Sequence, residues 1–309
     1  MRSHQIILRA AALLALPIVL SACSGTETVT GPSAAVGPQR TREQNIELGR
    51  QHKTAVDLFK YLRDEAKGGR KLEWNRLPDW SGVYSRPLDK GFNFDVDQPK
   101  DVPTSAKLTP EYQAKLEKRL ADLKKGIEWD PISTCAPPGV PRWLTEPFLR
   151  EFIVTPDQTW LINEMVNDIR RVYTDGREHT PEADRIPIPN GDTIGFWDGP
   201  RLIMHTNELK SGIYQRGNPD YSDQVETVEI WQKTDDKTLG VDVWVYDPPA
   251  LVEPWYVYHT YVKLSDPPRI RYWDCGENPN NSVFQNKDGT TEFRDLKYTE
   301  DSTTEKSKP

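Results

Sequence analysis

Two carboxylates and one histidine could form an acid and base site if the three strands that carry them pair as their hydrophobic pattern suggests. Side chains alternate between the two faces of a strand, so Glu229 and Asp242 each lie on the mixed polar and aromatic face of their strand, opposite its aliphatic residues. With the hairpin tip at residues 235–236, the aliphatic faces match and Glu229 lies opposite Asp242. Pairing the next strand across the following loop places His259 beside Asp242.

This row of Glu229, Asp242 and His259 predicts general acid and base chemistry. Two facing carboxylates repel each other unless a proton, a cation or a basic neighbour compensates them, and one pKa of such a pair is raised. Trp231 and Trp244 share the same face, so the row could line an aromatic ligand cavity. The alternative is that this face points into water and carries solvated charges or a structural ion pair.

A second group of candidate residues surrounds the Asp-Gly turn signal at residues 175–176. Arg171 and Tyr173 share one face of the strand before the turn, and Arg177 follows it. Loops often carry binding residues, so we expect these three side chains to assist ligand binding. The alternative is a surface hairpin without function.

The sequence predicts neither a metal nor a cofactor. His179, His205 and His259 lack the local spacing of metal ligands and could bind a metal only if the fold gathered them. A nucleophile elbow, a zincin motif, a phosphate loop and a dinucleotide fingerprint are all absent from the sequence.

Two helices and a run of short strands must position these residues. Apolar spacing predicts one amphipathic helix over residues 42–67 and a second that begins at Thr109, with Pro110 in its first turn. Alternation and turn signals predict strands near residues 80–84, 150–154, 159–163, 168–173, 193–197, 202–206, 225–232, 239–246, 255–264 and 269–273, with a further one at 292–298.

These elements predict a mainly β protein: an antiparallel barrel or sandwich, a lipocalin-like barrel being one form, with two N-terminal helices. The predicted organisation is a signal peptide at 1–22, a flexible tether at 23–40, a helical lead-in with one early strand at 41–130, the β domain at 131–298 and a disordered tail at 299–309.

The first 23 residues predict a bacterial lipoprotein. Arg2 and Arg9 flank an apolar stretch that is too short to span a bilayer and ends in Leu-Ser-Ala before Cys23. Cleavage before Cys23 and lipidation of its thiol would anchor the protein in the cell envelope, most simply at the outer membrane facing the periplasm. Without the two arginines of the signal, the chain has 38 basic and 47 acidic side chains. The resulting net charge of −9 disfavours nucleic acid as a partner.

Besides Cys23, the chain contains Cys135 and Cys275. An even number of cysteines in an oxidising compartment favours one disulfide between them, and two buried free thiols are the alternative.

Five stretches are similar to a family of uncharacterised exported bacterial proteins: residues 77–84, 135–142, 170–179, 191–206 and 274–278. The most specific is the run with two arginines, an aromatic residue and Thr-Asp-Gly-Arg, which reads Arg-Arg-Val-Tyr-Thr-Asp-Gly-Arg at residues 170–177. The resemblance implies acids at Glu229 and Asp242 and a basic residue at His259, but no activity.

The sequence thus favours an envelope protein that binds a small polar or aromatic ligand in a β-domain cavity. A hydrolase or lyase that uses the carboxylate pair with His259 is one alternative, and a structural lipoprotein without a cavity is another.

Overall fold

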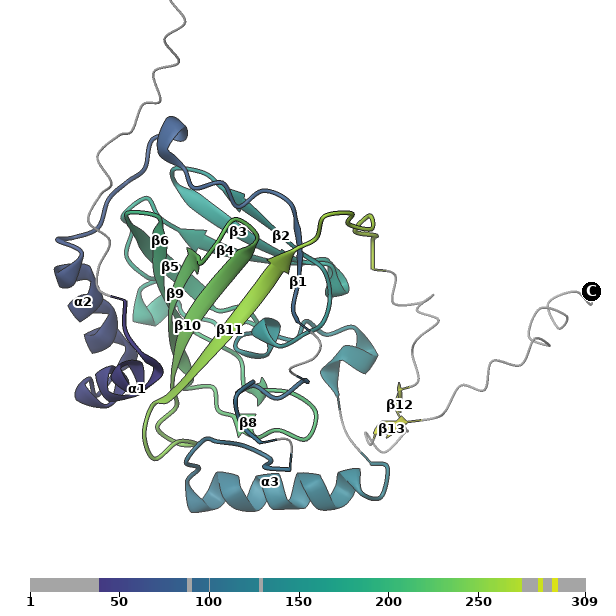
Figure 1. Ribbon diagram of the computed structural model, residues 1–309. Coiled ribbons are helices and arrows are strands. Elements are labelled where there is room, and N and C mark those ends of the chain that lie inside the picture. The colour runs from purple at the N-terminus through teal and green to yellow at the C-terminus, as the bar shows by residue number, and fades with distance from the viewer. Residues whose placement is uncertain are drawn as a thin grey trace, which may run out of the picture. The chain divides into compact units, whose positions relative to one another are not determined.

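The computed structural model describes residues 39–87, 91–99, 101–127 and 130–273, and two short strands at 283–285 and 291–293 (Figure 1). The predicted signal peptide, Cys23, Cys275 and the predicted tail lie outside the described residues. Everything below concerns the part of the chain that is described.

Within the described residues, nine strands form a closed barrel, which confirms the predicted mainly β fold and its barrel form (Figure 1). Around the barrel the order is β1, β11, β10, β9, β6, β5, β4, β3, β2. Neighbours are antiparallel except β4 and β5, which are parallel at their one contact. The strands are β1 (Val83–Ser85), β2 (Arg150–Val154), β3 (Gln158–Asn163), β4 (Asp168–Tyr173), β5 (Asp192–Asp198), β6 (Arg201–Asn207), β9 (Glu226–Lys233), β10 (Thr238–Tyr246) and β11 (Trp255–Lys263).

The eight strands from β2 to β11 in the barrel begin and end within one residue of their predicted bounds. The early strand β1 does not stand apart from the β domain, because it closes the barrel between β2 and β11. Residues 269–273 were predicted as a strand and form none. The remaining strands are β7 (Gly212–Ile213), β8 (Asp220–Tyr221), β12 (Val283–Gln285) and β13 (Thr291–Phe293).

The predicted register of the hairpin between β9 and β10 is wrong by one residue. Asp242 pairs with Ile230, and Glu229 pairs with Val243, so the two acids lie on opposite faces of the sheet. The register of β11 places His259 on the face of Glu229, not on that of Asp242. The predicted row of two acids and a histidine therefore does not form.

The turn that joins β9 to β10 explains the error. The N–H of Thr234 donates to the carbonyl of Thr238 at 2.9 Å, which leaves residues 235–237 in the turn, one more than predicted. The Asp235 carboxylate stabilises this turn by accepting from the N–H groups of Lys237 and Thr238, at 2.8 and 2.9 Å. A turn longer by one residue moves each side chain of the partner strand to the other face.

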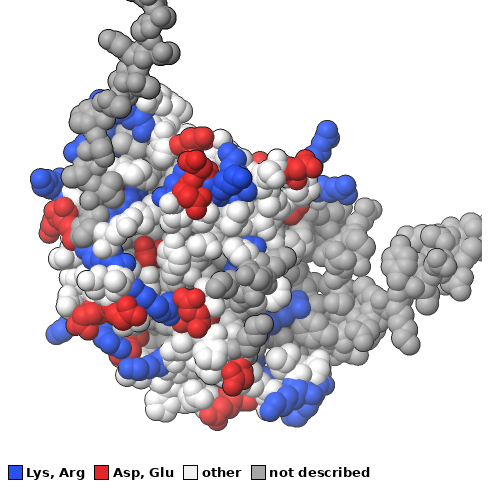
Figure 2. Space-filling view, in the orientation of Figure 1, with Lys and Arg blue, Asp and Glu red and all other residues white. Residues whose placement is uncertain are grey.

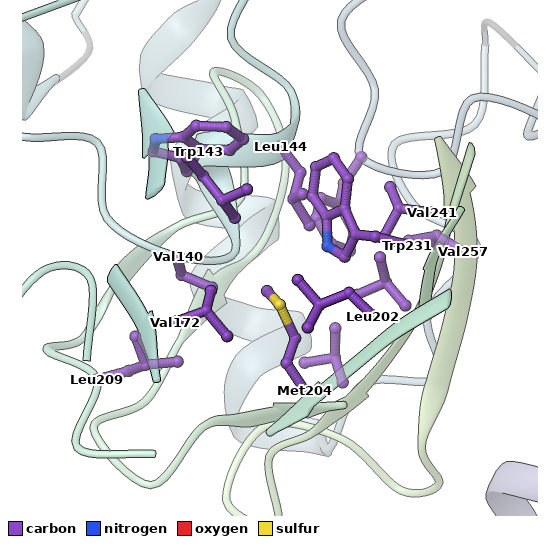
Figure 3. Packing of buried hydrophobic residues seen from close by; sticks show 14 of the residues in the cluster. Val140, Trp143, Leu144, Val172, Leu202, Met204, Leu209, Trp231, Val241 and Val257 are labelled. Atoms are coloured by element: carbon purple, nitrogen blue, oxygen red, sulfur yellow. The ribbon is translucent and has the colours of Figure 1, made fainter. Parts of the chain in front are cut away.

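Two separate hydrophobic clusters cover the two faces of the barrel wall. The inner cluster is rich in aromatic rings, and Trp231 stacks on Tyr261 with ring centroids 5.4 Å apart. Figure 3 shows Trp143, Leu202 and Met204 converging in this interior. The outer cluster packs helices α1 (Arg42–Gln51) and α2 (Ala55–Glu65) against β5, β6, β9, β10 and β11. Because both faces are buried, matching aliphatic faces could not fix the register.

The single helix predicted over residues 42–67 is two helices. The second helix begins after Thr54, whose hydroxyl accepts from the N–H of Asp57 at 3.1 Å and caps α2. Gly49 lets α1 approach the sheet closely, since a Cβ there would lie 2.8 Å from Trp244 Cδ1.

The second predicted helix is α3 (Pro110–Leu123), with Pro110 in its first turn as expected. It buries Tyr112 and Leu116, and its Arg119 forms an ion pair with Asp220 of β8. Among the described residues, no helix combines the length and the apolar character that a bilayer span requires.

Candidate functional site

Glu229 lies inside the barrel, where its carboxylate is fully engaged. Arg170 of β4 donates to both carboxylate oxygens, at 2.7 and 3.1 Å, and the two side chains are 1% exposed or less. Thr227 and Trp231 donate to the same two oxygens at 3.0 and 2.8 Å. A carboxylate accepts about four hydrogen bonds, so these four leave no position for a substrate. Glu229 therefore links β9 to β4 across the barrel interior.

His259 also lies inside the barrel and is 1% exposed. Neither of its ring nitrogens has a hydrogen-bond partner among the described residues. Burial lowers the pKa of His259 well below its usual value, and the charges of Arg86 and Arg150 lower it further. The ring is therefore neutral, and it does not act on Asp242, which lies on the other side of the sheet.

Asp242 lies on the outer face of β10, beneath α1. Its Oδ1 accepts from the Tyr256 hydroxyl at 2.6 Å and from the Asn45 amide at 3.0 Å. Burial raises the pKa of Asp242, and the Tyr256 hydrogen bond and the charge of Arg201 only partly oppose this. No cation among the described residues lies within ion-pair distance of Asp242, in contrast to Glu229.

Three elements hold this carboxyl in place. Asn45 comes from α1, Asp242 from β10 and Tyr256 from β11, and Asn45 also donates to the Tyr256 hydroxyl at 3.0 Å. Burial raises the pKa of Tyr256, and the neighbouring Asp242 raises it further, so Tyr256 remains a protonated donor. The triangle of side chains is therefore fixed by packing of the helix on the barrel.

A cavity of about 520 Å³ opens beside Asp242. Its wall is formed by the residues before α1, by α1 itself and by the outer faces of β6, β9, β10 and β11. This volume lies within the range of about 300–1,000 Å³ that small-molecule sites occupy. The charged residues of the wall are Arg40, Arg42, Asp97, Arg201, Lys233 and Asp242.

Three of the four basic side chains in the wall have acidic partners. The fourth, Lys233, belongs to the inward-facing residues of β9 with Glu229 and Trp231, and its charge acts on Asp79 and Asp235. Figure 2 shows basic and acidic side chains interspersed on the face that carries β10 and β11. The paired residues are Arg40 with Glu65, Arg42 with Asp95 and Asp97, and Arg201 with Asp198.

A smaller cavity of about 300 Å³ lies beside Arg142, Glu146 and Phe148. Arg142 in its wall donates to Glu146 at 2.5 Å and to Asp130 at 2.8 Å, and all three side chains are buried. These polar groups are engaged with one another, so this cavity is less suited to orienting a polar ligand than the cavity beside Asp242.

The tryptophans predicted to bind the ligand have packing roles instead. Trp231 fills the barrel interior, and Trp244 lies beneath α1, where its Nε1 donates to the Asn45 carbonyl at 2.7 Å. Neither side chain lines the cavity beside Asp242.

The predicted group at the Asp-Gly turn lies on β4 and in the loop that follows. Arg171 is exposed and stacks over Trp160, and Arg177 lies 4.0 Å from the ring centre of Tyr173. These side chains form cation–π contacts on the outer surface, and none of them lines the cavity beside Asp242. The inward residue of the Arg-Arg pair is Arg170, which the sequence did not single out.

The fold brings two of the three histidines together. His179 Nε2 lies 2.8 Å from His205 Nδ1. The other ring nitrogen of His179 lies 2.9 Å from Asp192 Oδ2, and the other ring nitrogen of His205 lies 3.1 Å from Glu226 Oε2. Both ring nitrogens of each histidine are engaged, so neither presents a free nitrogen to a substrate. Among the described residues, no group of three or more histidine, cysteine or acidic side chains could hold a metal ion.

Two predicted modifications involve cysteines that lie outside the described part of the chain. Cys135 ends a short helical turn at residues 131–134, but Cys275 lies outside the described residues, so the disulfide between them stays a prediction. Cys23 and its lipidation stay predictions for the same reason.

The site residues that the sequence missed are Asn45 and Tyr256. One signal could have indicated their importance: β9 and β10 carry large apolar residues on both faces, which is typical of a sheet covered on both sides. A helix had to cover the outer face, and Asp242 then had to be buried beneath it.

No protein-family model matches the chain, and no curated protein matches it. The resemblance to exported bacterial proteins therefore stays a prediction, and the function must be inferred from the geometry of the site.

Proposed function

We propose that the protein binds a small polar molecule in the cavity beside Asp242. The observation that carries this proposal is the environment of that carboxyl: burial raises its pKa, only neutral groups donate to it, and it lies in the wall of a cavity of about 520 Å³. A carboxyl kept in such a state within a cavity is a strong candidate for a ligand contact.

The hydrogen bonds at Asp242 leave room for a ligand. Tyr256 and Asn45 both donate to Oδ1, and no described residue donates to Oδ2. When ionised, Oδ2 can accept from a ligand hydroxyl or amine, and when protonated it can donate to a ligand oxygen. Asp242 can therefore orient a polar ligand in either protonation state.

A hydrolase or lyase that uses a pair of carboxylates is not part of this proposal. Glu229 and Asp242 lie on opposite faces of the sheet, and Glu229 is held by Arg170. Binding without turnover requires only the cavity and the one available acid.

We also propose that the protein works as a lipoprotein of the cell envelope, attached to the membrane through Cys23. The basic start, the short apolar run and the small residues before Cys23 support this. Mass spectrometry of the N-terminal peptide from cell membranes should find acyl chains on Cys23, and Cys23→Ser should release the protein into the soluble fraction. An unmodified Cys23 at an uncleaved N-terminus would contradict the anchor.

The binding proposal is tested by ligand capture. The immobilised protein is incubated with a small-molecule extract of bacterial cells and washed, and the released compounds are identified by mass spectrometry. Asp242→Asn keeps the shape of the side chain and removes its charge, and Asp236→Asn at the exposed hairpin tip is the matched control.

We expect a compound that is enriched on the wild type and on Asp236→Asn and is lost from Asp242→Asn. Thermal unfolding of both variants checks that the fold is intact. Enrichment of no compound, or equal enrichment on folded Asp242→Asn, would contradict the proposal.

A further inference from the structure

Four side chains on the outer face of the barrel form a continuous hydrogen-bond chain. His179 Nδ1 lies 2.9 Å from Asp192 Oδ2, and His179 Nε2 lies 2.8 Å from His205 Nδ1. His205 Nε2 then lies 3.1 Å from Glu226 Oε2. The His205 ring is 1% exposed and lies beneath α2, with its centroid 5.6 Å from that of Phe59. None of these residues lines the cavity beside Asp242, so the hydrogen-bond chain is a separate feature of the molecule.

The three contacts of the hydrogen-bond chain need three protons, because two acceptors at such distances repel each other. A neutral imidazole carries one N–H group, so two neutral histidines supply only two protons. Asp192 supplies none, since its Oδ2 also accepts from the N–H of Thr180 at 2.8 Å. Burial alone would raise the pKa of Asp192, but the hydrogen bonds from His179 and Thr180 hold it below the usual value. One proton is therefore missing as long as both rings are neutral and both carboxyl groups are ionised.

We propose that His179 binds this third proton and that the hydrogen-bond chain is a pH-sensitive latch, closed when His179 is an imidazolium and opened when that proton is lost. In the closed form His179 donates from Nδ1 to Asp192 and from Nε2 to His205. The neutral His205 ring then donates from Nε2 to Glu226.

The environments of the two rings assign the proton to His179. Burial lowers the pKa of His205, and the hydrogen bond and charge of Glu226 only partly oppose this. His179 is less buried, with a side chain that is 13% exposed, and it directly contacts the ionised Asp192. An ordinary imidazole binds a proton more tightly than an ordinary carboxylate, so the proton does not lie on Glu226.

Loss of this proton breaks one contact. The neutral His179 ring keeps its Nδ1–H group for Asp192 and turns a lone pair toward His205. The single N–H group of His205 can then donate to His179 or to Glu226, but not to both. A hydrogen bond to a carboxylate is the stronger of the two, so His205 keeps its contact with Glu226. The contact between the two histidine rings therefore opens.

Two arginines approach the hydrogen-bond chain from outside. Arg63 of α2 pairs with Glu178 at 3.9 Å, and Arg177 pairs with Asp175 at 2.7 Å, although the charge of Arg177 also reaches Asp192. Each arginine thus has an acidic partner of its own. The charges that act on the inner ring, His205, are those of the other three members of the hydrogen-bond chain, and the two acids among them favour a bound proton.

The latch holds the long connection between β4 and β5 against the barrel. Residues 175–178 and 181–188 of this connection are exposed, whereas His179 and Thr180 between them are partly buried. The strands β4 and β5 themselves pair at a single position. His179 therefore ties the middle of the connection to β6 through His205, and opening of the contact between the rings releases that tie.

Nitrogen-15 NMR of the histidine rings tests the proton directly, because the shifts of the ring nitrogens report which of them is protonated. We expect His179 to be protonated at both nitrogens at about pH 6 and only at Nδ1 at about pH 9, with His205 protonated at Nε2 throughout. Over the same range, the protection of the Thr180 N–H against hydrogen exchange should fall about tenfold, because one hydrogen bond of the connection is lost.

Glu226→Gln separates a latch held by a proton from a merely structural contact. The new amide can donate to His205 Nε2, after which His205 donates to His179 and His179 donates to Asp192, so all three contacts close without the third proton. The protection of Thr180 in this variant should therefore stay within about twofold between the two pH values. His52→Gln, which changes a histidine outside the hydrogen-bond chain, should keep the tenfold loss of the wild type.

A neutral His179 ring at pH 6 would overturn the proposal, and so would Thr180 protection in the wild type that is the same at both pH values. Equal losses of protection in the wild type and in Glu226→Gln would also overturn it, because the pH dependence would then come from another group. The ring measurements on the wild type decide the proposal even where a variant does not fold.

Discussion

Glu229 and Asp242 lie on neighbouring strands of one hairpin, yet they face opposite sides of the barrel wall and have different hydrogen-bond partners. Inside, Glu229 meets a guanidinium and two further donors, and all of its acceptor capacity is used. Outside, Asp242 meets only a phenol and an amide, both on the same oxygen. The comparison teaches that the donors around a buried acid, rather than its burial, decide whether it serves structure or remains available to a ligand.

The largest effect is expected inside the barrel. Arg170→Met should lower the free energy of unfolding by about 3–5 kcal/mol, because it leaves the Glu229 charge buried without a partner. Urea denaturation measures this loss. The neighbouring Arg171→Met is the control and should cost only about 0.5–1 kcal/mol, the value of an exposed cation–π contact. Equal losses in the two variants would show that the interior ion pair is not the distinguishing feature.

An intermediate effect on stability is expected at Asp192, which is hydrogen-bonded to His179. Burial alone would raise the pKa of Asp192, but the hydrogen bonds from His179 and Thr180 hold it below the usual value. A carboxyl whose pKa is lowered by folding stabilises the fold at pH values above its unfolded-state pKa, which is near 4. This contribution is lost as the pH falls.

Asp192→Asn should therefore cost about 1–2 kcal/mol at pH 7 and much less near pH 2.5. Urea denaturation of both proteins at the two pH values checks this, with Asp236→Asn as the exposed control. The same loss at both pH values would mean that Asp192 acts by packing and not by its charge.

Asp242→Asn should have a smaller effect of the opposite sign. Folding raises the pKa of Asp242, so the unfolded chain ionises first, and stability falls as the pH rises from about 4 through the folded-state pKa. The variant cannot ionise and should be more stable than the wild type by on the order of 1 kcal/mol at pH 8. Thermal unfolding at pH 4 and pH 8 measures the difference, which should widen with pH. A destabilised variant at pH 8 would place Asp242 with Glu229 among the structural acids.

The smallest effect on stability is expected at Lys233. Because Lys233 has no ion-pair partner among the described residues, Lys233→Ala should change the free energy of unfolding by less than about 0.5 kcal/mol. The same denaturation assay checks this. A larger loss would show that Lys233 stabilises the hairpin through its charge on Asp79 and Asp235.

The strand bounds could be predicted from the sequence because alternation and turn residues are local properties. The register could not be predicted, because it depends on the Asp235 side chain, which lengthens the turn by one residue. The consecutive residues Arg170 and Arg171 show the same limit: one faces the interior and the other faces solvent, and composition alone does not say which.

The candidate site was only half predictable for a related reason. Asp242 was singled out, but its partner Asn45 lies 197 residues earlier in the chain, on a helix whose packing side the sequence did not determine. The pairing of His179 with His205 likewise depends on the long connection between β4 and β5, and no spacing rule indicates where such a loop returns.

The most direct test of the contrast between the two faces is to add the captured compound back to isotope-labelled protein and map the side-chain resonances by NMR. We expect shifts at Asn45, Asp242 and Tyr256 and none at Arg170 or Glu229 inside the barrel. Shifts confined to the barrel interior, or to the exposed group of Arg171, Tyr173 and Arg177, would contradict it.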